Sequence, residues 1–540
     1  MRKADMVLYN GQIHTMVSDS VVSATAVKDG RIVAVGTDAE ILALCGEDTE
    51  KIDLAGDCTL PGFNDSHCHL RLTGEGFSKL DLRGVTSREE IVARGREYMH
   101  ATPLKEGEWV VGYGFDHNLF PDGALPDIET AQAISDTVPV ILDRVCGHVG
   151  AVNRPALRIA GFDELTHIPG GVLDKDLSGK LNGILREAAL DRIKGLIKKP
   201  DIETVMSQLR AVMAELNSLG VTSAQSDDLE GSDLDTLLEA FNTLEANGDM
   251  TLRVFEEVQA ARIPVLELFL SRGLRTGDGS EWFKIGNIKM LTDGSLGART
   301  AWLREDYSDD PGNRGVPVYT QEELDEMVLR AHQAGMQVAF HAIGDGAIDC
   351  CVSAVEKAQA AEPKKMRHRI VHCQFADKEL FQRMAAAGMA ADVQPAFVAS
   401  DSPLTASRIG DSHNICAYAW NTMRESGVHI AGGSDSPVEL PDPLWGIYCA
   451  VTRQNRDGQP EGGWRPSERL NIMEAVRLYT TGGAYVSFEE NEKGTIESGK
   501  MADFAVLSKD IFSIPPRELL NTCVLRTIVG GKTCYCAPAL

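Results

Sequence analysis

The sequence predicts an α/β fold: a (β/α)8 TIM barrel with a small flanking β-sandwich and an inserted lid subdomain. Short apolar runs rich in β-branched residues recur along the chain, helix-like segments separate most of them, and polar residues stand where several runs end. Strands that alternate with helices in this number favour a closed parallel barrel. The candidate strands are 62–67, 221–226, 252–258, 284–291, 337–341, 368–372, 389–394 and 428–433.

The segments between these strands complete the predicted barrel. Roughly 150 residues separate the first strand from the second, which is too long for a single βα connection. We therefore expect an inserted subdomain at about 72–200, over the barrel mouth, where it would shape substrate specificity. Apolar periodicity of the helical kind occupies 202–219, 321–335, 346–360, 377–387 and 413–426.

Both ends of the chain contain short strands separated by turns, such as Asn10-Gly11 and Asp29-Gly30. Turns of this kind connect neighbouring strands of a sheet. Residues 1–60 and 487–540 are therefore predicted to pair into one discontinuous β-sandwich domain. The barrel is expected to span 61–486.

Polar residues that can bind metal follow several of the predicted strands. His67 and His69 end the first strand, and alternate residues of a strand point the same way, so both imidazoles could bind one ion. A His-x-His pair is weak evidence by itself. His341 and His372 end the fifth and sixth strands, and Asp435 follows the eighth. Strand ends are where barrel enzymes keep their chemistry.

Lys289 lies within the apolar run 283–293, on the predicted fourth strand. A lysine on a central strand is buried, and a buried ammonium needs a reason. Each candidate alone also has a structural explanation, such as a core histidine or a helix cap. Their joint order along the strands favours a metal site. The other histidines, among them His14, lack such a placement, and most of them are expected to be structural.

The phrases around these residues point to a known family. They are Leu60-Pro-Gly-Phe-Asn-Asp-Ser-His-Cys-His, Lys289-Met-Leu-Thr-Asp-Gly-Ser-Leu-Gly-Ala-Arg-Thr-Ala, His341-Ala-Ile-Gly-Asp and Gly433-Ser-Asp-Ser-Pro. Together with the strand order His-x-His, Lys, His, His and Asp, they resemble the amidohydrolase superfamily, in particular its YtcJ-like branch, which includes N-substituted formamide deformylases. The resemblance runs nearly end to end. It includes Asn10-Gly-Gln-Ile-His-Thr and Gly499-Lys-Met-Ala-Asp-Phe-Ala-Val-Leu, both typical of the flanking β-sandwich.

The resemblance implies a site with one or two divalent metal ions, for which zinc is the leading candidate. In the favoured interpretation, His67 and His69 bind one metal, and His341 and His372 bind the other. Lys289 reacts with carbon dioxide to form a bridging carbamate, and Asp435 binds the first metal and shuttles protons. The alternative is a single metal with Lys289 unmodified and salt-bridged. Sites of this type also accept manganese, iron or cobalt.

The predicted insertion contributes one further catalytic candidate. His148 lies in 143–153, which resembles a family segment with a histidine close to the active site, so it is expected to hydrogen-bond or polarise the substrate carbonyl. A purely structural His148 is the alternative. The aromatic and polar run 109–118 is a weaker candidate for pocket lining. Arg299, after the fourth strand, either meets a substrate carboxylate or forms a structural ion pair.

These features predict metal-dependent hydrolysis of a non-peptide carbon–nitrogen bond in an amide, such as an N-substituted formamide or an N-acyl amine. Metal-bound hydroxide attacks the carbonyl, and Asp435 takes the water's proton and later protonates the departing amine. No organic cofactor is needed. Two alternatives stay open: cyclic-amide hydrolysis or deamination on the same fold, and a catalytically inactive scaffold.

Composition limits the classes of partner. The 540 residues are 43% hydrophobic and can bury a large core. The net charge is -26, without a notable cluster of lysine and arginine, which argues against nucleic acid and an anionic membrane as partners. The expected partner is a small-molecule amide substrate. Whether the chain forms a homo-oligomer is left open.

The start of the chain shows no signal peptide and no spanning helix, so a cytoplasmic location is expected. The 12 cysteines contain no Cys-x-x-Cys couple and are interpreted as reduced thiols. Strand alternation predicts that Cys68 points away from the metal. Cys534 and Cys536 are expected to be surface thiols.

Overall fold

The computed structural model describes residues 3–102, 104–105, 107–145, 147–228, 234–410 and 416–538. The chain divides into two compact units. Unit 1 comprises Met1–Leu70 and Leu209–Leu540, and unit 2 comprises Arg71–Gln208. The insertion expected at about 72–200 falls within unit 2.

Unit 1 contains a nearly closed barrel of eight parallel strands, as the sequence predicts. Their order is β23-β21-β19-β18-β17-β16-β15-β8, so neighbours in the sheet follow one another along the chain. Every bound lies within one residue of the predicted one. The strands are β8 (Phe63–Cys68), β15 (Val221–Asp227), β16 (Arg253–Gln259), β17 (Phe283–Leu291), β18 (Val338–Ala342), β19 (Arg369–His372), β21 (Ala390–Val393) and β23 (His429–Gly432).

Backbone hydrogen bonds join the last strand to the first just beyond the strand ends. The Asp435 amide donates to the His67 carbonyl oxygen, and the His69 amide donates to the Ser436 carbonyl oxygen, both at 2.8 Å. This closure brings residues that are more than 360 positions apart in sequence to the same edge of the barrel, where the chemistry of such folds lies.

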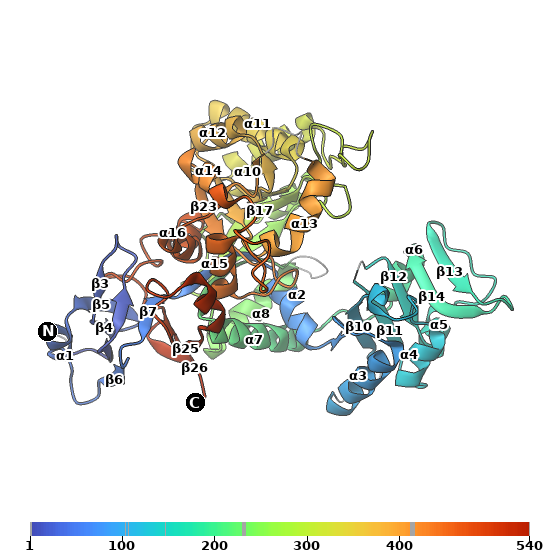
Figure 1. The fold of residues 1–540 in the computed structure, drawn as a ribbon, viewed down its shortest axis with the longest axis horizontal. Coiled ribbons are helices and arrows are strands. Elements are labelled where there is room, and N and C mark those ends of the chain that lie inside the picture. The colour runs from blue at the N-terminus through green and yellow to red at the C-terminus, as the bar shows by residue number, and fades with distance from the viewer. Residues whose placement is uncertain are drawn as a thin grey trace. The chain divides into compact units, whose positions relative to one another are not determined.

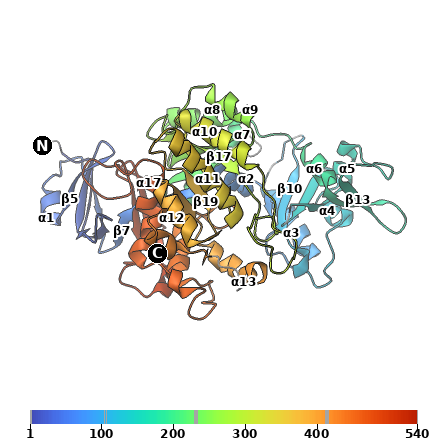
Figure 2. The ribbon, with the colours of Figure 1, turned by 90° about the horizontal axis from the view of Figure 1, so that it is seen from above.

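Helices surround the barrel (Figure 2). Four predicted helices match the structure closely. Side-chain caps begin two of them: Thr320 and Glu323 form a capping box at α10, and Asp377 caps α12. The helix α7 (Ile202–Ser218) begins in unit 2 and ends in unit 1. The further helices of unit 1 include α8 (Leu234–Asn247), α9 (Ile263–Leu270), α10 (Gln321–Gln333), α11 (Asp345–Ala361), α12 (Lys378–Ala386), α13 (Phe397–Ile409), α14 (Trp420–Glu425), α15 (Pro443–Thr452), α16 (Ile472–Arg477) and α17 (Gly483–Val486).

The helix predicted over 413–426 is wrong in its first part. Residues 413–415 lie outside the described residues, and Cys416–Ala417 form the short strand β22. This strand pairs antiparallel with β20 (Phe375–Ala376), so a long-range sheet contact overrides the local helical pattern. The helix α14 begins only at Trp420.

The two ends of the chain meet in a pair of sheets with strand orders β5-β4-β1-β6 and β26-β25-β24-β7-β2-β3. In the second sheet β7 pairs antiparallel with β24, so the N-terminal and C-terminal strands lie side by side (Figure 1). Apolar side chains from both ends share one core, including Leu8, Phe504 and Ile528. The bounds are β1 (Met6–Tyr9), β2 (Gln12–His14), β3 (Val21–Val22), β4 (Ala24–Lys28), β5 (Arg31–Gly36), β6 (Glu50–Asp53), β7 (Cys58–Pro61), β24 (Phe504–Leu507), β25 (Val524–Val529) and β26 (Lys532–Cys536).

Unit 2 is a separate α/β body with its own apolar cores. Its mixed sheet has the order β13-β14-β12-β11-β10-β9. The strands are β9 (Leu80–Asp81), β10 (Val110–Phe115), β11 (Val140–Arg144), β12 (Val149–Val152), β13 (Gly171–Lys175) and β14 (Leu181–Glu187), and the helices are α3 (Arg88–Ala101), α4 (Ile128–Ile134), α5 (Arg154–Ala160) and α6 (Ala188–Lys194).

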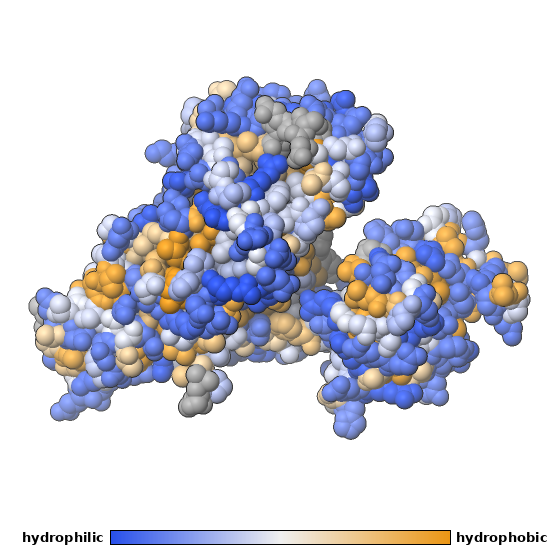
Figure 3. All heavy atoms as spheres, in the orientation of Figure 1, coloured by the Kyte–Doolittle hydropathy of each residue, from blue (hydrophilic) through white to orange (hydrophobic). Residues whose placement is uncertain are grey.

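Hydrophilic residues dominate the face drawn in Figure 3, with apolar residues interspersed. This matches the share of charged residues, 24% of the chain. Among the described residues, no helix combines the length and the apolar character needed to cross a membrane.

Candidate metal centre

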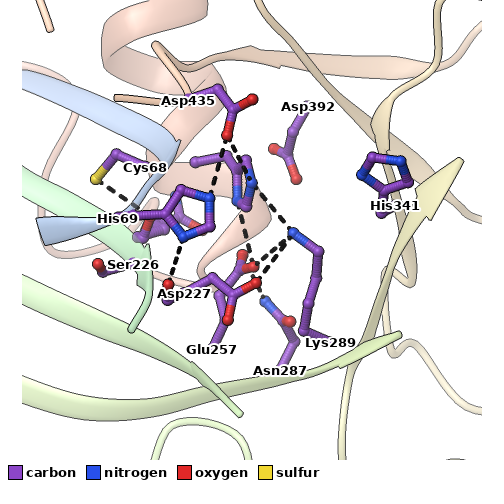
Figure 4. A network of polar contacts seen from close by, with 12 residues as sticks. Cys68, His69, Ser226, Asp227, Glu257, Asn287, Lys289, His341, Asp392 and Asp435 are labelled. Atoms are coloured by element: carbon purple, nitrogen blue, oxygen red, sulfur yellow. Dashed lines mark hydrogen bonds and ion pairs between the residues drawn. The ribbon is translucent and has the colours of Figure 1, made fainter. Parts of the chain in front are cut away.

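The two histidines of the His-x-His motif meet Asp435 at one edge of the barrel. Figure 4 shows His69 beside Asp435. Asp435 Oδ1 lies 3.5 Å from His67 Nε2 and 3.3 Å from His69 Nε2. Cys68 turns its sulfur toward the Gln225 carbonyl oxygen, 3.7 Å away, so it does not join the group. Two imidazoles and one carboxylate at these separations could share a metal ion.

The buried carboxylate of Asp65 positions Asp435. It accepts hydrogen bonds from the Ser434 amide at 3.0 Å, the Ser434 hydroxyl at 2.6 Å and the His67 amide at 3.2 Å. Asp65 therefore ties the loop after β23 to the first strand. Asp435 itself has φ of 58°, a left-handed conformation that is uncommon outside glycine and that often marks functional positions.

Charges in this group are strongly coupled. Burial would raise the pKa of Asp435, but the hydrogen bond from His69 and the charges of nearby histidines lower it below its usual 3.8. Burial lowers the pKa of His69, but Asp435 and Asp227 raise it, and the net value is about 9. Near neutral pH and without metal, His69 therefore carries a proton that a cation would displace on binding.

His341 on β18 and His372 at the end of β19 form a second pair. His372 Nε2 lies 3.0 Å from His341 Nδ1. The outer nitrogens face oxygen acceptors: His372 Nδ1 is 2.9 Å from Gln394 Oε1, and His341 Nε2 is 3.1 Å from the Gly294 carbonyl. Gln394 donates its own amide to the Asp392 carbonyl oxygen, which keeps its oxygen turned toward His372. Both outer nitrogens therefore carry the hydrogen.

The inner nitrogens of this pair are then two lone pairs that face each other. Burial lowers the pKa of His341 to about 4 and that of His372 well below 6.5, so both rings are neutral near pH 7. Two imidazole nitrogens that share a tetrahedral zinc ion lie about 3.3 Å apart, given a Zn–N distance of 2.0–2.1 Å. The observed 3.0 Å is close to that value. The pair thus fits a shared cation.

The outer nitrogens of the first two histidines also face oxygen. His69 Nδ1 lies 2.5 Å from the Asp227 carbonyl oxygen, and His67 Nδ1 lies 3.3 Å from Glu257 Oε2. Metal-binding histidines are usually oriented in this way by an acceptor on the second nitrogen. In all four rings, the nitrogen that remains for a metal is the one that faces the centre of the cluster.

Lys289, on β17, reaches into the same cluster and is almost fully buried (Figure 4). Its Nζ lies 3.1 Å from His67 Nε2 and 3.5 Å from both Glu257 Oε2 and Asp227 Oδ2. The amine therefore occupies the position toward which a ligand nitrogen points, and two carboxylates neighbour it. Lys289 is brought together with the five other predicted metal ligands.

A buried ion network beneath the cluster was not anticipated from the sequence. Arg369 lies 2.8 Å from Glu257 and 3.1 Å from Asp392, and Asn287 donates to Glu257 at 3.1 Å. Burial raises the pKa of Glu257, but Lys289, His67 and Arg369 lower it below its usual value. Glu257 therefore remains an anion. Asp227 ends the second strand and Glu257 lies two residues before the end of the third, so a search of the strand ends could have found both.

His148 belongs to unit 2 and is exposed. Its Nδ1 lies 3.0 Å from Glu187 Oε2, in hydrogen-bonding geometry. This contact with Glu187 is the one expected of a structural His148. The catalytic role of His148 stays a prediction. The weaker candidates of the run 109–118 also lie in unit 2, where Arg144 contacts Asp116 and His117.

Arg299, in the loop after β17, pairs with Asp309 through two hydrogen bonds of 2.9 and 3.0 Å. The ion pair was one of the two predicted roles of Arg299, and the structure shows it. Such a pairing orients the guanidinium without requiring a substrate carboxylate.

The barrel brings together the cluster of His67, His69 and Asp435, the pair of His341 and His372, and Lys289 toward the carboxyl ends of its strands. This arrangement is that of the metal-dependent barrel hydrolases. Within this class the chain belongs to the amidohydrolase family, whose model matches residues 50–535. It is therefore a hydrolytic enzyme that acts on carbon–nitrogen bonds, rather than an inactive scaffold.

Comparison with individual proteins agrees with this assignment. The chain is 36% identical to a putative amidohydrolase, YtcJ, of Bacillus subtilis, over 98% of each chain. It is 25% identical to an N-substituted formamide deformylase of Arthrobacter pascens, again over 98% of each. An uncharacterised metal-dependent hydrolase of Pyrococcus furiosus has a similar crystal structure, with a TM-score of 0.78 and 30% identity over 94% of this chain and 100% of the other.

Proposed function

We propose that the enzyme hydrolyses the amide bond of an N-substituted formamide or a related N-acyl amine, with divalent metal, most simply zinc, as cofactor. The observation that carries this proposal is the inward orientation of four histidine nitrogens around Asp435 and Lys289. The relative named as an N-substituted formamide deformylase supports the choice of substrate class. The strongly negative net charge suits a small-molecule substrate better than nucleic acid or an anionic membrane.

In this proposal His67, His69 and Asp435 hold one metal ion, and His341 and His372 hold a second. A divalent ion bound there lowers the pKa of water and polarises an amide carbonyl. The pairing of outer nitrogens with oxygen acceptors orients the ligands for such an ion before it arrives.

Asp435 moves the proton in the proposed reaction. Its carboxylate is ionised in the resting enzyme because its pKa is low, so it can accept the proton of the attacking water. The same group, once protonated, gives the proton to the departing amine nitrogen as the carbon–nitrogen bond breaks. We also propose that His148 interacts with the substrate carbonyl and that the enzyme works in the cytoplasm.

Screening of small amides tests the substrate class. Metal-loaded enzyme should release amine and formate from N-alkyl or N-benzyl formamides, and more slowly from the matching N-acetyl amines, because acetyl adds a methyl group at the carbonyl. Amine is measured with a fluorogenic reagent and formate with a coupled dehydrogenase. Ring opening of a cyclic amide, or ammonia release from an amino-substituted heterocycle, with no turnover of open-chain amides, would replace this proposal with its alternative.

We propose further that Lys289 carries a carbamate, which would supply anionic oxygen ligands to metal held by the histidines of the cluster. An ammonium beside His67 Nε2 repels a cation, whereas a carbamate supplies two anionic oxygen ligands. Asp227 and Glu257, each 3.5 Å from Nζ, would otherwise neutralise an unmodified ammonium, which is the single-metal alternative.

Replacing Lys289 by alanine should remove metal and activity, and adding short carboxylic acids together with metal should restore part of the activity, since they can replace the missing carbamate. Metal content and amide turnover are the measurements. In addition, ¹³C-labelled bicarbonate should give a carbamate signal in wild-type protein that is lost in Lys289→Ala.

Lys284→Ala is the matched control, because Lys284 lies on the same strand and pairs with Glu489, which keeps Lys493 as a second partner. This variant should retain metal, the carbamate signal and most activity. A fully active wild-type enzyme that lacks the carbamate signal would favour the unmodified lysine.

A further inference from the structure

A second cluster of metal-ligating side chains lies in the β-sandwich. His14 is the last residue of β2, Cys58 is the first residue of the neighbouring β7, and Asp510 comes from the C-terminal part of the chain. One ligand atom from each lies within 4.8 Å of the others. Parallel pairing of β2 with β7 brings the first two together, and β24, which pairs with β7, leads into the segment that holds Asp510.

His14 lies beside the carboxylate of Asp510. Its buried Nε2 lies 3.1 Å from Asp510 Oδ1, so the imidazole and the carboxylate form a close pair.

The imidazole of His14 is also held in place. The Phe512 ring stacks on it at a centroid distance of 4.1 Å and an interplanar angle of 30°. The residue is only 8% exposed. Asp510 Oδ1 is oriented as well, because it accepts the Phe512 amide at 3.2 Å. A nitrogen and an oxygen held 3.1 Å apart in fixed orientations are positioned to bind a common metal ion.

Cys58 adds the sulfur ligand and is completely buried. A cysteine, histidine and aspartate together could also suggest a nucleophilic triad. Burial, together with the negative charge of Asp510, raises the pKa of the Cys58 thiol to about 12, and no substrate could reach it. The cluster is therefore not a nucleophilic site.

We propose that His14, Cys58 and Asp510 form a structural transition-metal site, separate from the catalytic cluster, that takes zinc. Zinc accepts nitrogen, sulfur and oxygen donors together, whereas magnesium and calcium avoid thiolate. On binding, the ion displaces the thiol proton of Cys58 to solvent, and a sulfur–metal bond forms.

The position of the three ligands indicates what the ion does. His14 and Cys58 belong to the N-terminal strands, and Asp510 belongs to the C-terminal segment that completes the same sheet. A metal bound by all three crosslinks the two ends of the chain in the folded state only, so it stabilises the sandwich. Zinc should accordingly raise the melting temperature of this domain.

Cobalt(II) distinguishes this site from the catalytic one, because only a thiolate ligand gives a near-ultraviolet sulfur-to-cobalt charge-transfer band. The catalytic cluster has no such ligand among the described residues, since Cys68 turns away. Metal-depleted wild-type enzyme titrated with cobalt(II) should develop the band. Cys58→Ser should lose the band and about one metal equivalent per chain, and should keep amide turnover.

Two further variants complete the test. Cys45→Ser, at another cysteine of the N-terminal segment, should retain the band. His67→Ala should also retain it while losing catalytic metal, so failure of this proposal is distinguishable from failure of the proposed function. Absence of the band in cobalt-loaded wild type, or its survival in Cys58→Ser, would overturn the proposal, and the wild-type measurement decides even if a variant fails to fold.

Discussion

Replacing His67 or His341 by alanine should reduce amide hydrolysis by a factor of about 1,000 or more and lower the amount of bound metal. Each imidazole points its inner nitrogen into the cluster, at His67 Nε2 and His341 Nδ1. Loss of one ligand weakens the metal, whose contribution to catalysis is several kcal/mol, and about 4 kcal/mol corresponds to that factor. Metal content by atomic emission and turnover of a cleaved formamide are the measurements.

The fold should survive both substitutions. The barrel and its cores are built from apolar strands that do not depend on a single polar ligand. Circular dichroism and gel filtration should match the wild type, and His100→Ala, at an exposed position on α3, is the control with full activity. Wild-type metal content and wild-type turnover in both histidine variants would contradict the assignment of the metal site.

Replacing Asp435 by asparagine should separate metal binding from proton transfer. The asparagine carbonyl oxygen can still approach the metal of His67 and His69, so much of the metal should stay bound. An amide cannot accept the water's proton, so turnover should fall by a factor of about 100 or more, the usual scale for a general acid–base group. Retention of metal with loss of rate distinguishes this variant from those of the histidines.

The pH–rate profile gives a second readout of the same substitution. The pKa of Asp435 lies below its usual value, so the wild-type carboxylate accepts protons in the resting enzyme and loses this ability only as the pH falls. Asparagine does not titrate, so the acid limb should change in shape as well as in height. Near-normal turnover in Asp435→Asn would mean that another residue moves the proton, and His148 would be the next candidate.

The strands of the barrel could be predicted from the sequence because each strand is specified by a short run of neighbouring residues. Each of the eight strands is a short apolar run with a polar residue or turn at its end, and the structure places every bound within one residue. The segment 413–426 failed because its first described residues pair with Phe375–Ala376, a contact that no local pattern reveals.

The sequence by itself determined that the chain alternates strands and helices and folds as a barrel of the amidohydrolase type. It also placed the candidate ligands at or near strand ends: His67, His69, Lys289, His341, His372 and Asp435. Only the tertiary structure decided which nitrogen of each histidine faces inward, because that depends on acceptors such as Gln394 and the Gly294 carbonyl, which come from other elements. It also decided that Glu257 and Arg369 neutralise each other beneath the cluster, and that His14 meets Cys58 and Asp510. These are contacts between residues distant in sequence, and they arise only when packing brings their strands together.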